Sequence, residues 1–226
     1  MVWQSTFRPH YRSRQSTLGI LLRKEARFRF QKHYTPNGKE TSDVTRLGLY
    51  FYDKPPKHSM HMDIVYDASL ATPANTKSYA QTLDKVFDRD VMLYSLLPHA
   101  HLRGRAAKFT AHYPDGRKEI LLSVPKYDFN WQPLYVLNPP KLMPAGTRIV
   151  MDITWDNSTQ NPANPDPNKV VHWGDQTWEE MNVGWFRFRD ADDDDRAKVA
   201  QTGGEKRAAA PLQPGSGNPQ QSTGIH

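Results

Sequence analysis

The sequence contains no cysteine, no long apolar run and no extended helical pattern. Without cysteine the chain can form no disulfide, no thiolate-ligated zinc or iron–sulfur site and no thiol nucleophile. The absence of an apolar run of about eighteen residues excludes a membrane-spanning helix of the usual kind. No segment keeps a helical apolar period for about twelve residues, which argues against a helical domain. These absences leave a β-rich protein as the first expectation.

Positive charge is concentrated at one end of the chain. The formal net charge is +6, but residues 1–50 carry ten Lys/Arg and three Asp/Glu, while the remaining residues are nearly neutral. No basic stripe interleaved with aromatic residues and no nucleic-acid motif occurs, so we expect no nucleic-acid partner. Residues 1–25 also lack a signal-peptide pattern, because their apolar patch at residues 18–22 is short and has no cleavage site behind it.

The middle of the chain consists of short alternating or apolar segments separated by Pro/Gly turns, which is typical of β-sandwiches and jelly rolls. The expected strands are 26–31, 47–52, 59–66, 91–97, 108–113, 119–124, 149–155 and 183–188. Pro114-Asp115-Gly116 between two of them predicts a hairpin. Residues 191–226 are rich in Asp, Gly, Pro, Ser and Gln, which predicts a disordered tail. We therefore predict a jelly-roll-like antiparallel β-sandwich with a disordered C-terminal tail.

His99 and His101 form the most informative motif in the sequence. On an extended strand, residues i and i+2 point to the same side with Cα atoms about 7 Å apart, so two imidazoles could bind one metal ion. Met181 would add a thioether, a ligand that favours Cu(I) over hard cations. Taken alone, an H-x-H pair among nine histidines is more often ordinary surface or core histidine, and a single methionine is more often core.

Other catalytic arrangements lack the residues they need. No H-E-x-x-H, no G-x-S-x-G and no phosphate-binding glycine loop is present. Glu179 and Glu180 are adjacent and point to opposite sides of an extended backbone, so they form no carboxylate pair for glycoside hydrolysis. Metal chemistry at the H-x-H pair is the remaining specific hypothesis.

Three segments together resemble a known family. Residues 98–104 read PHAHLRG, residues 127–132 read YDFNWQ and residues 178–181 read WEEM. This order resembles the C-terminal domain of the copper type II, ascorbate-dependent monooxygenases, the family of peptidylglycine α-hydroxylating and dopamine β-monooxygenases, and especially its bacterial members. The resemblance implies that His99, His101 and Met181 bind the copper at which O2 is activated.

The same resemblance implies a second, electron-supplying copper held by histidines of an N-terminal domain. Residues 30–34 look like the last strand of that domain, which makes His33 a candidate ligand, but the chain has no His-His pair to supply the other two. We therefore interpret residues 1–25 as an unassigned basic segment and residues 26–57 as remnant strands of this copper domain. The C-terminal copper domain then spans 58–190, followed by the tail at 191–226.

Several positions differ from the peptide-amidating members of the family. Leu97 stands where an arginine helps to bind the substrate carboxylate, Trp185 replaces a tyrosine, and Asn182 replaces a cysteine. These differences argue against a peptidylglycine substrate. Trp185 and Phe186 are candidate walls of a substrate pocket.

Three hypotheses follow. The first is a copper monooxygenase domain that uses copper and ascorbate or a similar reductant to hydroxylate an unactivated C–H bond of an unknown substrate. The second is a non-catalytic copper-binding module that lacks the second copper site or has a partner domain to supply it. The third is a β-sandwich without metal. The family resemblance also suggests a periplasmic or extracellular location.

Overall fold

The computed structural model describes residues 18–32, 34 and 38–198, and its regular structure is almost entirely β. The strands are β1 (Leu18–Gly19), β2 (His58–Ser59), β3 (His61–Tyr66), β4 (Ala71–Thr72), β5 (Tyr79–Val86), β6 (Val91–His99), β7 (Gly104–His112), β8 (Lys118–Val124), β9 (Tyr135–Met143), β10 (Arg148–Trp155), β11 (Val171–His172) and β12 (Val183–Asp190). Among the described residues, no helix is long and apolar enough to cross a membrane.

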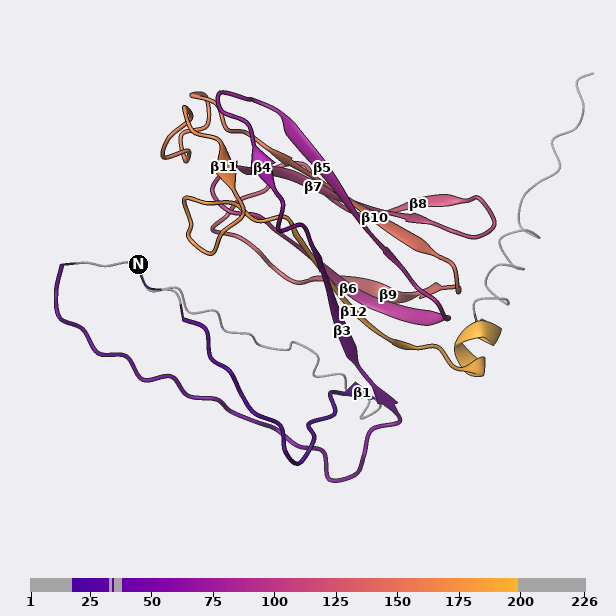
Figure 1. The fold of residues 1–226 in the computed structure, drawn as a ribbon. Helices are drawn as coiled ribbons and strands as arrows, with labels where there is room; N and C mark the ends of the chain where they lie inside the picture. Colours follow the sequence, from indigo (N-terminus) through magenta and orange to yellow (C-terminus); the bar gives the residue numbers. More distant parts are fainter. Residues whose placement is uncertain (1–17, 33, 35–37, 199–226) are drawn as a thin grey trace, which may run out of the picture. The chain divides into compact units, whose positions relative to one another are not determined.

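Two four-stranded antiparallel sheets lie face to face (Figure 1). One sheet has the order β5-β10-β7-β8 and the other the order β3-β12-β6-β9, so β10 and β12 are interior strands that pair on both sides. Two short pairs, β4 with β11 and β1 with β2, lie outside these sheets. The predicted antiparallel β-sandwich is confirmed.

The core fills the space between the sheets with side chains from both inner faces. After the exposed Arg148, β10 alternates between buried and half-buried residues, whereas β6 is buried along nearly its whole length, in agreement with its continuous apolar sequence. Trp155, Phe109, Phe186 and Met151 are fully buried in this cluster. Gly184 on β12 faces the core because a Cβ there would lie 2.6 Å from Met151 Sδ.

Most predicted strands are present, and the hairpin at residues 114–116 is formed between β7 and β8 with Gly116 at φ 85°. The prediction of strands at 26–31 and 47–52 is wrong, because both segments are irregular in the structure. Their large apolar side chains are mostly exposed, and no neighbouring strand pairs with them among the described residues. Alternation alone does not form a strand when the backbone lacks a partner.

Residues 191–198 belong to a unit separate from the β-sandwich. Residues 193–198 form a short helix with a reciprocal cap. The Asp195 N–H donates to Asp192 Oδ1 (3.0 Å), and the Asp192 N–H donates to Asp195 Oδ2 (2.8 Å). The rest of the predicted tail lies outside the described residues.

Candidate metal centre

His99 and His101 lie where β6 ends. His99 is the last residue of β6, and His101 follows two residues later, just before the turn into β7. Their ring centroids are 5.2 Å apart and their planes are inclined by 81°. His101 is buried and His99 is half-buried. The structure therefore brings the two predicted imidazole ligands together, although only His99 lies within a strand.

Met181 and His101 lie just beyond the same end of the β6–β12 ladder. Val183 pairs with His99 at the start of β12, Met181 lies two residues before Val183, and His101 lies two residues after His99. The N–H groups of His101 and Met181 both donate to Glu180 Oε2, at 2.8 and 3.3 Å. The backbone positions of all three predicted ligands thus meet at one end of the β6–β12 ladder.

Both imidazoles are held through Nδ1 by oxygen acceptors. His99 Nδ1 lies 2.6 Å from Gln132 Oε1, and His101 Nδ1 lies 3.1 Å from the carbonyl oxygen of Glu179. Gln132 Nε2 donates to the Phe129 carbonyl (2.8 Å), which fixes Oε1 as the amide atom that faces His99. A neutral imidazole that donates from Nδ1 carries its lone pair on Nε2. This is the tautomer that a metal ligated through Nε2 requires.

The YDFNWQ segment packs directly against the histidine motif. The Tyr127 hydroxyl accepts from the Ala100 N–H (3.0 Å) and donates to the Ala100 carbonyl (2.6 Å). The Phe129 ring meets the His101 ring edge-on, with centroids 6.0 Å apart. Gly104 allows this approach, since a Cβ there would lie 2.7 Å from Tyr127 Cδ1. Two segments that are far apart in the sequence therefore form one packed unit.

Glu180 is a fully buried carboxylate that accepts four N–H donors. Oε1 accepts from the Arg103 backbone (2.6 Å), and Oε2 accepts from the backbone of His101 and Met181 and from Trp155 Nε1 (3.1 Å). Burial raises the pKa of Glu180 to about 7, while the backbone donors oppose that rise. This arrangement, which we call the Glu180 clamp, ties the chain after β6 to the chain before β12.

The Arg103 side chain extends the clamp into the loop after β10. Its Nε donates to Asn157 Oδ1 (2.8 Å), and one terminal nitrogen donates to the Trp178 carbonyl (2.8 Å). Asn157 is fully buried and donates in turn to the carbonyls of Pro73 and Lys169. Burial lowers the pKa of Arg103, and the nearby Glu180 carboxylate opposes this shift.

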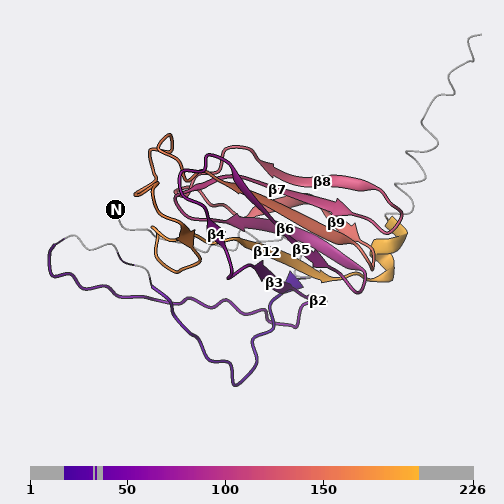
Figure 2. The ribbon, with the colours of Figure 1, turned by 45° about the horizontal axis from the view of Figure 1, so that its top comes forward.

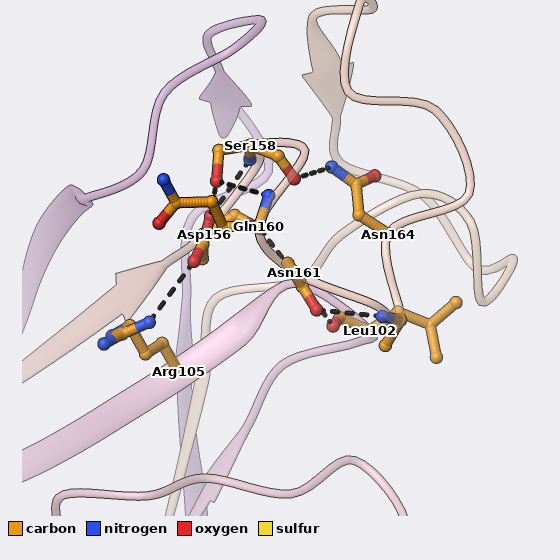
Figure 3. A network of polar contacts seen from close by, with 8 residues as sticks. Leu102, Arg105, Asp156, Ser158, Gln160, Asn161 and Asn164 are labelled. Atoms are coloured by element: carbon orange, nitrogen blue, oxygen red, sulfur yellow. Dashed lines mark hydrogen bonds and ion pairs between the residues drawn. The ribbon is translucent and has the colours of Figure 1, made fainter.

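Polar contacts stabilise the loop after β10 (Figure 3). Asp156 Oδ1 accepts from the backbone and hydroxyl of Ser158 (3.0 and 2.6 Å), and Asp156 Oδ2 pairs with Arg105 (3.2 Å). Asn161 Nδ2 donates to the carbonyls of Leu102 (3.3 Å) and Asp156 (2.9 Å). The polar sequence predicted as a loop thus supports the turn that follows His101.

The remaining predicted site residues lie apart from one another. Phe186 is fully buried between the sheets, with its ring 5.7 Å from that of Phe109. Trp185 points to the opposite face of β12, where it pairs with Leu97. The two side chains therefore do not line one common pocket. His33 lies outside the described residues.

The structure adds two features that the sequence reasoning missed, the Glu180 clamp and the Gln132 contact. A cavity of about 540 Å³ also lies beside the clamp, lined in part by Arg103, Lys169 and Trp178.

Among the described residues, no three His, Asp or Glu side chains gather as a metal-binding group. The predicted donors, two imidazoles and a thioether, are of the types that suit Cu(I).

Comparisons with known proteins give structural matches at low TM-scores. The sequence matches no family model and no curated protein. Similar solved structures include the infectious bursal disease virus VP2 subviral particle, at 10% identity and a TM-score of 0.27, over 58% of this chain and 32% of that chain. Another is the infectious bursal disease virus Gt strain, at 11% identity and a TM-score of 0.25, over 65% and 38% of the two chains. The chain thus spans about a third of the viral chains it matches.

Proposed function

We propose that this chain is a copper-dependent monooxygenase domain that holds copper with His99, His101 and Met181. The observation that carries the proposal is the pair of Nδ1 contacts, which gives both imidazoles the tautomer needed for ligation through Nε2. The resemblance of the three sequence segments to the ascorbate-dependent copper monooxygenases supports the same assignment. When bound, copper would supply the one-electron chemistry that activates O2, with ascorbate or a similar reductant as the electron source.

The chain's own residues provide orientation and exclusion of water. Gln132 and the Glu179 carbonyl fix the two rings, and the Glu180 clamp fixes the backbone on which His101 and Met181 sit. A thioether ligand stabilises the reduced metal. The packing of Phe129 against His101 shields one side of the site. The substrate is a molecule with an unactivated C–H bond.

The alternative function is a copper-binding module without catalysis of its own. The irregular course of the described residues within 26–57 favours it, because residues 26–57 were expected to be strands of the domain that holds the second copper. In that case a partner domain would supply the electron, and the His99–His101 pair would bind copper without sustained turnover.

Copper binding tests the carrying observation directly. We expect the reduced protein to bind one Cu(I) per chain, and Gln132→Ala to weaken binding by roughly 10- to 100-fold because the His99 ring loses its orienting acceptor. Gln160→Ala is the matched control, since the Gln160 side chain is exposed and the residue's contact with Ser158 uses its backbone N–H, which the substitution keeps. Equal copper affinity for Gln132→Ala and the wild type would contradict the proposed role of the Nδ1 contact.

Oxygen consumption separates the two functions. For a catalytic domain we expect ascorbate-dependent O2 uptake by the copper-loaded wild type to exceed that of a His99→Ala variant. Equal rates, together with intact copper binding by the wild type, would reject autonomous catalysis and leave the binding module.

A further inference from the structure

β3 is an edge strand with an exposed apolar face. It pairs only with β12 among the described strands, and its pairing shows no register shift. Met62, Ile64 and Tyr66 alternate along it and are 45–57% exposed. Its one charged residue, Asp63, pairs with Lys85 (2.6 Å). The edge has no lysine, proline or bulge to block strand addition, and Lys85 pairs the charge of the inward-pointing Asp63, so the strand can act as a template for a further strand. Figure 2 shows β3 directly after β2.

Residues 47–52 have the alternating sequence typical of a strand but form no strand in the structure. Leu47, Leu49 and Phe51 alternate and are 46–74% exposed, and the backbone of this segment is irregular. An extended conformation would place these three side chains on one face. The segment has the same length as β3, six residues.

We propose that residues 47–52 of one copy add as an antiparallel strand to β3 of a second copy, in the register that pairs Leu49 with Ile64. This register also pairs Leu47 with Tyr66 and Phe51 with Met62. The apolar face of the donor segment then continues the exposed face of β3. The main chain supplies the hydrogen bonds, and the alternate side chains supply the fit.

Charge agrees with the same register. One step beyond the last apolar pair, Arg46 of the donor stands opposite Asp67 of the acceptor, so opposite charges meet at the end of the new ladder. On the other side of β3, Ile64 pairs with Trp185, which pairs with Leu97. The donor strand therefore extends an apolar row that already crosses three strands.

A second copy is favoured as the donor because contacts hold the connection between residue 52 and β3 in place. The Tyr52 hydroxyl donates to the Leu18 carbonyl (2.7 Å), and β1 pairs with β2 directly before β3 begins. Pro56 packs against Gly19 in the same connection. Pairing within one chain would need a reversal in this connection, whereas exchange between two chains leaves it intact. Since each copy carries one donor and one acceptor, reciprocal exchange closes as a two-fold dimer.

Cysteine crosslinking tests this register, because the natural chain has no cysteine. Leu49→Cys and Ile64→Cys variants are mixed in the full-length protein and oxidised mildly. We expect a reducible mixed dimer of twice the 26.0 kDa chain mass. The matched control pairs Leu49→Cys with Val86→Cys, since Val86 is equally exposed on an edge strand of the other sheet. No more mixed dimer than in this control would overturn the proposal.

Two further readouts keep the test independent of crosslinking. Light scattering should give twice the chain mass for the wild type and for Val86→Lys, and the single-chain mass for Ile64→Lys with unchanged circular dichroism. A wild type that remains monomeric at high concentration would overturn the proposal. A double variant, Leu49→Cys with Ile64→Cys, that crosslinks only within single chains would overturn it in favour of pairing in cis.

Discussion

Replacing Glu180 by Gln tests the clamp that aligns the predicted ligands. Gln keeps the shape of the side chain but exchanges one carboxylate oxygen for an NH2 group. If the remaining oxygen keeps the donors at Oε2, the NH2 group faces the Arg103 N–H, and a buried donor loses its acceptor. That loss costs about 1–3 kcal/mol, and the other bonds weaken because the acceptor is no longer charged. A neutral amide is easier to bury, which offsets part of this cost.

We therefore expect Glu180→Gln to lower the free energy of unfolding by about 2–4 kcal/mol, measured by urea denaturation at about pH 9, where a carboxyl with a pKa of about 7 is ionised. The melting temperature should fall by roughly 5–15 °C for a domain of this size. Glu179→Gln is the control, because that half-buried carboxylate accepts from the Gln176 N–H and should lose less than about 1 kcal/mol. A loss below about 0.5 kcal/mol for Glu180→Gln would refute the charged clamp, since an amide replaces a neutral carboxyl at little cost.

Two other predictions concern stability. Gly104→Ala should cost about 1–3 kcal/mol in urea denaturation because its Cβ would lie 2.7 Å from Tyr127, whereas Gly48→Ala, with open space around it, should be nearly neutral. Burial alone would raise the pKa of Glu119, but hydrogen bonds led by that from Lys141 outweigh it and lower the pKa. The ionised Glu119 therefore stabilises the fold above the normal carboxyl pKa, and this stabilisation is lost as pH falls. Glu119→Gln should flatten the acid side of the plot of unfolding free energy against pH. The same acid-side slope in Glu119→Gln and in the wild type would contradict this role of Glu119.

The fold could be predicted where the sequence carries its own pairing signals. The apolar run at 91–97 and the Pro-Asp-Gly turn at 114–116 correspond to β6 and the β7–β8 hairpin. β9 was missed because it contains Asn138-Pro139-Pro140, and prolines are tolerated there only because β9 lies at a sheet edge. The segments at 26–31 and 47–52 were overpredicted because alternation describes a side-chain pattern and not the presence of a neighbouring strand.

The site could be predicted only in part for a similar reason. The spacing of His99 and His101 is a local property, so their proximity follows from the sequence. Glu180 and Gln132 act through contacts across 79 and 33 residues, which no local pattern specifies. The sequence predicted only that the adjacent carboxylates at 179 and 180 point to opposite sides of the backbone, and no local pattern indicated that Glu180 would accept four N–H donors.

X-ray absorption at the copper edge tests the central claim most directly. For the Cu(I)-loaded wild type we predict scattering from two imidazoles and one sulfur, and for Met181→Leu we predict the same imidazole scattering without the sulfur. Met62→Leu is the control, since Met62 is exposed on β3 and lies outside the site. A Cu(I) spectrum without sulfur scattering, or one that Met181→Leu leaves unchanged, would contradict the assignment of His99, His101 and Met181 as a copper site.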